Sequence, residues 1–450
     1  MTEARSRPRL LPPLPLWVAA LLAVPGSYLG ATAYLGLSSF ALPPALAAVI
    51  YGIAIIGGAF ILSWAAEAAQ VDINAGLALA LLALLAVLPE YAVDFVFTWQ
   101  CGSVYAQGAP GLTGESNVCS LALANMTGAN RILVGVGWPL VILVASLAVW
   151  RARRAGAEQT TSKTTRRGEV RLAPNKSVEI VFLGIATLYS LTLPLKGTLT
   201  LWDTLIFFII FALYGWRLSK MQPSEPELIG ISQWVGSKDK RRRRAWVTGM
   251  FVAAAAVILL TAEHFAENLV SAGKQFGVSE FLLVQWVAPL ASESPELIVA
   301  CLYAWRLKGA DSLGTLLSSK VNQWTLLVGS LPAVFAVSAT AFHGLPIDMH
   351  QRYELLITGA QSLFAVAILL DRSLTFRGAI VLLALFLVQF LVSVMASDHV
   401  NRLTIVGLSI VYGILAIWQI ARHFRKVVQV TKDGTVTPFD KLADEPESAN

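Results

Sequence analysis

The stretches LAVLPEYAVDF (85–95) and ASESPELIVAC (291–301) decide the fold that we expect for this chain. Each places a Pro-Glu pair inside a run of residues apolar enough to cross a bilayer. A proline removes one backbone donor and opens a helix locally, and freed backbone oxygens are tolerated at that depth only where they line a cavity. Because a charge inside a membrane is costly, Glu90 and Glu296 are functional candidates, with Pro89 and Pro295 as predicted helix breaks.

The composition is that of an integral membrane protein. Of the 450 residues, 56% are hydrophobic and 14% are charged, whereas soluble domains have about 25% charged residues. The formal net charge of +6 comes from Lys and Arg in short polar segments, a pattern typical of membrane topology rather than of nucleic-acid binding. The sequence has no HExxH or GxSxG motif and no paired metal-binding histidines, so we predict neither an enzyme nor a cofactor.

Membrane spans are predicted wherever about 20 apolar residues follow one another. Twelve segments qualify: 15–38, 44–69, 76–100, 119–150, 177–197, 200–217, 245–270, 278–305, 313–342, 353–371, 377–397 and 402–421. With twelve spans, every segment rich in Lys or Arg falls on one face, which is then cytoplasmic. We therefore expect both termini in the cytoplasm and the protein in the plasma (inner) membrane.

The ends of the chain leave two points open. The first span has the basic start and the small residues of a signal peptide, and its cleavage would not change the orientation of the rest. The tail from about residue 432 is polar and is expected to be disordered.

An internal repeat connects the two Pro-Glu segments. In each case a helix is followed by the Pro-Glu helix (76–100 and 278–305) and then by a Gly-rich helix (119–150 and 313–342). In the twelve-span topology the two Pro-Glu helices run in opposite directions, which is the inverted-repeat architecture of many secondary transporters. We expect an all-α polytopic membrane protein with two five-helix repeats of opposite topology and an extra helix at each end.

The domain organisation follows from this repeat. It consists of a basic N-terminus with an extra first helix (1–43), a first repeat (44–217), a basic cytoplasmic loop (218–244), a second repeat (245–397), an extra last helix (402–421) and a cytoplasmic tail (422–450).

These motifs resemble the sodium/calcium exchanger family of the cation/calcium antiporter superfamily. Its two inverted repeats pair a G-T-S-x-P-E helix with a G-N-x-x-G-S-N-I helix. Here ANMTGAN (124–130) and GTLLSSK (314–320) are similar to the second motif. The resemblance implies a midplane cation site of carboxylates and neutral oxygens, with these residues as ligands: Glu90, Glu296, Asn125, Asn130, Ser292 and Ser319. Two further acids are expected to add to it: Glu293, which stands where the motif has a serine, and Asp94, one turn beyond Glu90 on the same helix face.

The chain also departs from the family motifs. Ala86 and Val87 stand where oxygen-bearing side chains are expected ahead of Glu90, and Lys320 stands where an asparagine is expected. Arg131 adds a second basic group to the Gly-rich helices. If both basic groups face the site, they compensate part of its negative charge, and the site would hold one divalent or two monovalent cations.

The predicted function is secondary antiport of cations by alternating access, in the manner of Na⁺/Ca²⁺ exchangers, with Glu90 and Glu296 binding the metal cargo. Exchange of Na⁺ or Ca²⁺ for H⁺ is the first alternative, and a membrane receptor or structural protein without transport activity is the second. Inorganic cations and the lipid bilayer are the expected partners, with no nucleic acid; the oligomeric state stays open. Cys101 and Cys119 bracket one polar loop, and whether they pair also stays open.

Overall fold

The computed structural model describes residues 13–37, 42–72, 88–108, 118–154, 165–166, 168–221, 228 and 230–443, and most of these residues are helical. The helices are α1 (Leu14–Tyr34), α2 (Pro44–Ala69), α4 (Leu88–Ala106), α5 (Val118–Leu121), α6 (Ala124–Ile132), α7 (Trp138–Arg154), α8 (Ser177–Ser190), α9 (Leu201–Leu218), α10 (Ile231–Gly236), α11 (Lys240–Phe276), α12 (Glu280–Leu282), α13 (Ala288–Trp305), α14 (Gly309–Asn322), α15 (Val328–Ser338), α16 (Met349–Ile368), α17 (Phe376–Met395), α18 (Asp398–Arg422), α19 (Phe424–Thr435) and α20 (Phe439–Ala443). Shorter 3₁₀ turns are η3 (Pro174–Lys176), η4 (Leu193–Leu195) and η7 (Leu369–Asp371).

Ten helical segments of the described chain are long and apolar enough to cross a membrane. They coincide with ten of the twelve predicted spans, and the chain is therefore an integral membrane protein. The remaining two predictions are the Pro-Glu segments, 76–100 and 278–305. Residues 76–87 of the first lie outside the described residues, and the second contains α13, with its two buried carboxylates.

Both Gly-rich segments change their helical pitch at corresponding places. The first runs as α6, a π-helical turn η1 (Leu133–Gly137) and α7, and the second as α14, η6 (Gln323–Leu327) and α15. The two π-turns begin at equal distances beyond Asn130 and Lys320, the last residues of the two motifs aligned from the sequence. π-turns are rare and occur mostly at functional sites, so both segments are distorted where the resemblance predicts a site.

The predicted break at Pro295 is not an interruption of the helix. Helix α13 is continuous from Ala288 to Trp305, because a proline removes one hydrogen bond of the helical ladder while the turns on either side keep theirs. The irregular turn lies earlier, in the π-turn η5 (Leu283–Val287) that leads into α13. Pro89 lies in the first turn of α4, where a missing N–H costs little.

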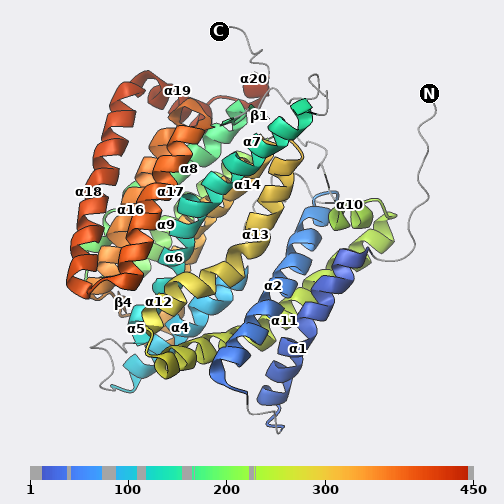
Figure 1. Cartoon of the computed structure of the whole chain (residues 1–450), viewed down its shortest axis with the longest axis vertical. Helices are drawn as coiled ribbons and strands as arrows, with labels where there is room; N and C mark the ends of the chain where they lie inside the picture. Colours follow the sequence, from blue (N-terminus) through green and yellow to red (C-terminus); the bar gives the residue numbers. More distant parts are fainter. Residues whose placement is uncertain are drawn as a thin grey trace.

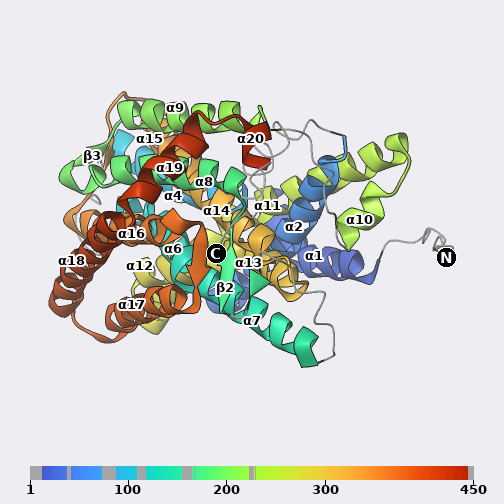
Figure 2. The ribbon, with the colours of Figure 1, turned by 90° about the horizontal axis from the view of Figure 1, so that it is seen from above.

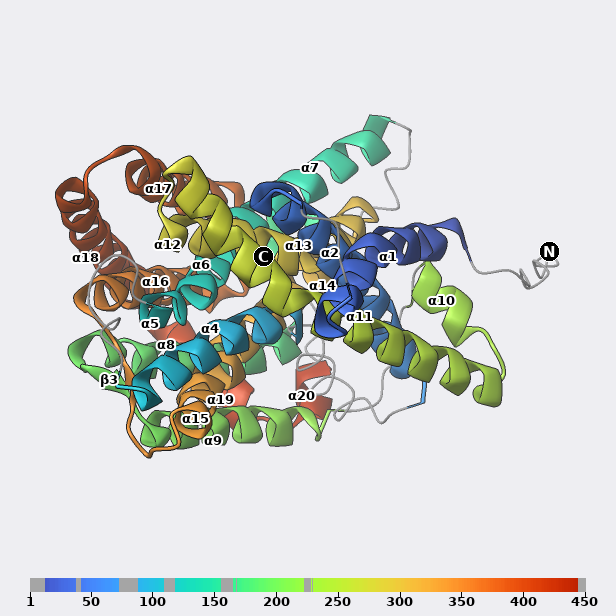
Figure 3. The same cartoon turned by 90° about the horizontal axis from the view of Figure 1, so that it is seen from below.

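The helices form two groups on either side of α13. Helices α1, α2 and α11 pack together in one group, while α16, α17 and α18 lie on the opposite side of the molecule (Figure 1). Viewed from above, α19 lies across one end and α9 runs along the edge of the molecule (Figure 2), and from below α4, α5, α6 and α12 gather at the other end (Figure 3). The largest buried core contains the fully buried rings of Trp138 and Trp324, contributed by the two Gly-rich segments.

Two small sheets join loops that are far apart in the sequence. In the first, β1 (Thr165–Arg166) pairs with β2 (Glu169–Arg171), which pairs with β5 (Ser373–Thr375). In the second, β3 (Thr198–Leu199) pairs with β4 (Leu345–Pro346). All pairings are antiparallel. Each sheet ties a loop of the first half of the chain to a loop of the second half, through the pairs β2–β5 and β3–β4.

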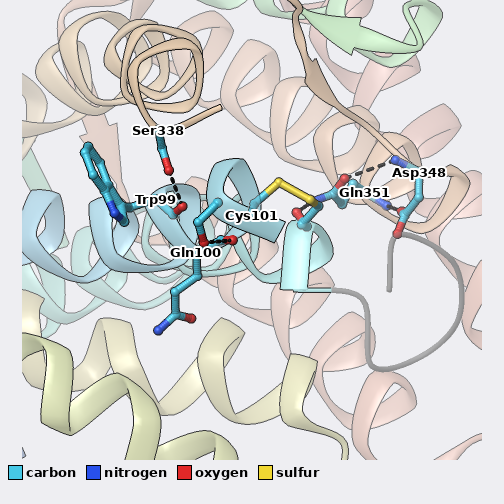
Figure 4. The surroundings of a disulfide bond; sticks show 8 residues. Trp99, Gln100, Cys101, Ser338, Asp348 and Gln351 are labelled. Atoms are coloured by element: carbon cyan, nitrogen blue, oxygen red, sulfur yellow. Dashed lines mark hydrogen bonds between the residues drawn. A yellow bond between two sulfur atoms is a disulfide. The ribbon is translucent and has the colours of Figure 1, made fainter. Parts of the chain in front are cut away.

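Cys101 and Cys119 form a disulfide that ties α4 to α5. Its surroundings connect these helices to the second half of the chain (Figure 4): Gln351 Nε2 donates to the carbonyl of Cys119 at 2.6 Å, and Ser338 Oγ donates to the carbonyl of Trp99 at 2.6 Å. Disulfides persist in oxidising compartments and are rare in the cytosol.

The prediction of a disordered tail from residue 432 is wrong for residues 432–443, which belong to α19, α20 and the turn between them. Arg217 explains the difference, because its guanidinium donates to the backbone carbonyls of Asp433, Gly434 and Thr437. The buried ring of Phe439 packs under the same guanidinium, with 4.3 Å between the ring centroid and Cζ of Arg217. A polar composition predicts disorder only when no such partners are present.

Candidate functional site

Carboxylates from α4 and α13 meet at one buried amide. Gln323 Nε2 donates to both carboxylate oxygens of Glu90, at 3.2 Å each, and also to Oε1 of Glu293. Glu90 is 1% exposed and Glu293 is fully buried. Gln323 is the first residue of the π-turn η6, so the distorted turn supplies the donor that joins the two Pro-Glu helices.

Glu296 completes the group of acids on α13. It lies close enough for its charge to act on Glu90, and both its oxygens are buried without a hydrogen bond within the described part of the chain. The hydroxyl of Ser319 on α14 faces this carboxylate without reaching hydrogen-bond geometry. Two carboxylate oxygens and one hydroxyl oxygen are therefore free to coordinate a cation at this position.

Asp94 lies one turn beyond Glu90 on α4 and is fully buried. It faces the side chain of Asn125 on α6, and neither side chain makes a hydrogen bond among the residues that the structure describes. This pair presents carboxylate and amide oxygens together. In contrast, Ser292 donates its hydroxyl to the carbonyls of Ala288 and Pro289 in its own helix.

The side chain of Lys320 extends from the second Gly-rich segment to the first. Its ammonium group donates to the backbone carbonyl of Asn130 at 2.6 Å, and its charge acts on Glu293. The side-chain amide of Asn130 donates to the carbonyl of Met126, which leaves its Oδ1 without a hydrogen bond within the described residues. Lys320 is fully buried, so its amine has these protein groups rather than solvent around it.

Arg131 does not compensate the predicted site, and this part of the charge assignment is corrected. Its guanidinium pairs with Glu354 of α16 at 2.7 Å and lies over the ring of Trp286, 4.7 Å from the centroid. Glu354 neutralises Arg131 locally, so the guanidinium has its own partner away from Glu90 and Glu296. Four acids then face one ammonium, and the site is more acidic than the sequence count indicated.

Two further residues of this region were missed from the sequence. Gln323 is an uncharged amide, and it gave no signal of its own in the sequence. Tyr91, next to Glu90, donates its hydroxyl to Oδ1 of Asn322 at 3.3 Å. Both contacts link α4 to the second Gly-rich segment, and only the fold brings these segments together.

The acids do not form a compact metal cluster. Among the described residues, no three His, Cys, Asp or Glu side chains converge tightly enough to hold an ion by themselves. Any cation bound here would need neutral oxygens as well, and those of Asn125 and Ser319 are available. Carboxylate, amide and hydroxyl oxygens are the ligands that hard cations such as Ca²⁺ prefer.

A stability prediction follows from the Arg131–Glu354 pair. Arg131→Met should destabilise the protein by about 3 kcal/mol or more, because removing one partner of a buried pair leaves an uncompensated charge. The double variant Arg131→Met/Glu354→Gln should recover most of that loss. Thermal unfolding of the purified protein in detergent measures both changes, and equal destabilisation of the single and double variants would contradict the pairing.

Comparison with known proteins identifies the family. The model of the sodium/calcium exchanger protein family matches residues 44–219 and 246–421. The chain belongs to this family. The first match contains Glu90 and Asn125, and the second contains Glu293, Glu296 and Ser319. Each Pro-Glu helix therefore belongs to its own copy of the sodium/calcium exchanger region.

Solved structures of exchangers are similar to this family member. The H⁺/Ca²⁺ exchanger CAX is 38% identical, with 95% of this chain and 96% of that chain covered and a TM-score of 0.79. The Ca²⁺/H⁺ antiporter YfkE shares the fold at 17% identity, with 89% and 100% of the chains covered and a TM-score of 0.56. The sodium-calcium exchanger NCX_Mj also matches, at 14% identity and a TM-score of 0.46 over 79% of this chain and 99% of that chain. The comparison with curated protein sequences gives no match.

Proposed function

We propose that this member of the sodium/calcium exchanger family is a secondary antiporter that exchanges Ca²⁺ for H⁺ by alternating access. The observation that carries the proposal is the convergence of Glu90, Glu293 and Glu296, from two helices, in a buried core. Several like charges cannot be buried together without compensation. Either a cation or protons must neutralise them, and alternation between these two states is the chemistry of H⁺/cation exchange.

Each residue of the site has a role in this proposal. Glu90 and Glu296 bind the metal cargo, and Glu293 and Asp94 add negative charge beside them. Neutral oxygens come from Asn125, Asn130, Ser292 and Ser319, and Ser292 keeps its oxygen lone pairs while its hydroxyl hydrogen is donated to the helical carbonyls. Lys320 places its amine beside Glu293 and donates to the backbone carbonyl of Asn130, and Gln323 keeps the α4 and α13 carboxylates at a fixed spacing.

Contacts between loops support the twelve-span topology. Because β2 and β5 pair, they lie on the same side of the membrane, and the chain between them must cross it an even number of times. Six predicted spans lie between these strands, and the number is even only if the segment of α13 crosses. Arg243 donates to both carboxylate oxygens of Asp72, at 2.8 and 2.7 Å, which holds the pKa of that carboxyl below its usual range. Asp72 and Arg243 therefore lie on the same side of the membrane. The number of predicted spans between them is even only if the segment of α4 crosses. Both Pro-Glu segments therefore count as spans.

The same contacts support cytoplasmic termini. β1, β2, β5, Asp72 and the tail bound by Arg217 fall on the face of the basic loops, whereas the disulfide falls on the opposite face. A disulfide belongs to the oxidising side of a membrane, so both lines of argument give the same orientation.

The inverted repeats are supported by reciprocal packing. Helix α8 of the first repeat packs on α14 of the second, and α16 of the second packs on α6 of the first. Likewise α9 packs on α15, and α17 packs on α7. In this proposal α1 and α18 are the extra helices, and the two repeats span 44–217 and 245–397.

H⁺ is favoured over Na⁺ as the coupling ion for two reasons. The relative that is 38% identical over 95% of this chain is an H⁺/Ca²⁺ exchanger. In addition, Ala86 and Val87 remove two oxygens that a site with several Na⁺ positions would use. Na⁺/Ca²⁺ exchange remains the second candidate, because the unbonded oxygens of Asn125 and Ser319 would suit Na⁺.

Reconstitution into liposomes tests the proposal. Purified protein should drive Ca²⁺ uptake under an imposed pH gradient and show little response to a Na⁺ gradient of the same size. Uptake driven by Na⁺ alone would establish the second candidate. Silence under both gradients, with protein that is folded and inserted, would favour a receptor or structural protein built on an exchanger fold.

A further inference from the structure

A second polar region lies at the end of the molecule that carries the disulfide. A cavity of about 640 Å³ opens between α5, α12, α16, α17 and the start of α18. Its acidic lining residues are Glu280, Asp348, Glu354 and Asp398, and its basic ones are Lys274 and His350. None of these residues belongs to the carboxylate group at Gln323.

Two of the four acids in the cavity are already paired. Glu280 pairs with Lys274 at 3.4 Å, and Glu354 pairs with Arg131 at 2.7 Å. Asp348 caps α16 by accepting from the backbone N–H of Gln351, and Asp398 lies exposed in the first turn of α18. With histidine neutral, Asp348 and Asp398 leave the cavity with net negative charge, so it attracts cations.

Buried amides aimed into the cavity provide the independent sign of a ligand. Gln285 lines the cavity and is fully buried, and neither its side-chain oxygen nor its nitrogen has a hydrogen-bond partner in the described part of the chain. Asn401 lines the cavity as well, is 7% exposed, and has an unpaired Oδ1. Buried amides without partners are costly, so these groups are satisfied by water or by a ligand's hydration shell.

The inner wall of the cavity is also the outer boundary of the carboxylate site. Glu354 faces the cavity and holds Arg131, and the adjacent residue Asn130 accepts from Lys320 through its backbone carbonyl. The charge of Lys320 in turn acts on Glu293. A continuous series of polar groups therefore connects the cavity to the midplane, with the Arg131–Glu354 pair between the two.

We propose that this cavity is an outer binding site for a hydrated divalent cation, closed from the midplane site by the Arg131–Glu354 pair. The volume exceeds by far the roughly 30 Å³ that one water occupies in the liquid, so an ion fits with its hydration shell. The absence of a tight cluster of three acids among the described residues excludes a dehydrated site of that kind here. Asp398 and Asp348 supply the charge, and Gln285 and Asn401 accept and donate hydrogen bonds to the bound waters. The assignment to the outer face rests on the proposed topology.

Direct Ca²⁺ binding tests this site independently of transport. In the variant Glu90→Gln/Glu296→Gln, radiolabelled Ca²⁺ should still bind weakly, and added salt should displace it because the ion keeps its waters. Adding Asp398→Asn, a change at an exposed position, should weaken that binding about three- to tenfold. Gln285→Leu should weaken it as well, and Asp311→Asn, an exposed acid on α14, is the control without effect. Absence of residual binding, or equal binding with and without Asp398→Asn, would overturn the proposal.

Flux measurements separate the failure of this inference from failure of the proposed function. In liposomes of known protein orientation, Asp398→Asn should raise the KM for Ca²⁺ offered at the disulfide-bearing face about three- to tenfold, with kcat unchanged. The KM at the opposite face should not change. Flux that depends on Glu90 but has the same KM in Asp398→Asn would remove the outer site and leave the exchanger intact.

Discussion

Glu90→Gln and Glu296→Gln should each lower gradient-driven Ca²⁺ flux by about 100-fold or more. Even outer partners of metal ligands change affinity or activity about 10- to 100-fold, and these two carboxylates are proposed as direct ligands. Glutamine keeps the size of the side chain but removes both the charge and the exchangeable proton. The measurement is initial Ca²⁺ uptake into liposomes under a fixed pH gradient.

Glu169→Gln is the matched control for this pair of variants. Glu169 lies in β2 and pairs with Arg171 at the surface, far in the sequence from the carboxylate group. Its replacement should leave uptake unchanged. Near-normal uptake in either Glu90→Gln or Glu296→Gln would show that one Pro-Glu helix is enough for transport. That result would contradict a single site formed by carboxylates of both helices.

The second large effect is expected at Gly128, where α6 crosses the π-turn η5. A Cβ atom added at this position would lie 1.7 Å from the backbone oxygen of Gln285. Neither backbone segment can move away without disturbing the contacts of Arg131 and Trp286 next to it. Gly128→Ala should therefore destabilise the protein by about 3 kcal/mol or more, the upper end for overpacked cores.

Gly407→Ala provides the comparison for Gly128. Gly407 lies within α18, and an added Cβ would meet nothing within 4 Å. Alanine is about 1 kcal/mol better than glycine inside a helix, so this variant should be as stable as the native protein or slightly more stable. Thermal unfolding in detergent measures both variants. A Gly128→Ala protein as stable as Gly407→Ala would mean that α6 and η5 are not in close contact.

The fold was predictable to the extent that it depends on apolar length and on rare polar residues. Ten spans and both Pro-Glu helices follow from long apolar runs, and an acid inside such a run is conspicuous because it is costly. The family resemblance followed from the same few residues. The tail was predicted wrongly because its order depends on Arg217, which lies 216 residues from Asp433 in the sequence.

The carboxylates of the site were predictable, but their partners were not. Glu90, Glu293 and Glu296 stand out against apolar neighbours, whereas Gln323 is an ordinary amide until the fold places it between them. The role of Arg131 was misjudged for the same reason. Its partner Glu354 lies near the start of another predicted span, where an acidic residue is common, and ion pairs between distant helices leave no pattern in one sequence.

Diffraction from crystals of the protein soaked with Ca²⁺, or with Sr²⁺ as a heavier substitute, tests the central claim most directly. The account predicts one density peak between the carboxyl groups of Glu90 and Glu296, lost when the soak is repeated at acidic pH as protons replace the ion. A peak that touches only one of the two carboxylates, or no peak at a Ca²⁺ concentration that saturates transport, would contradict it.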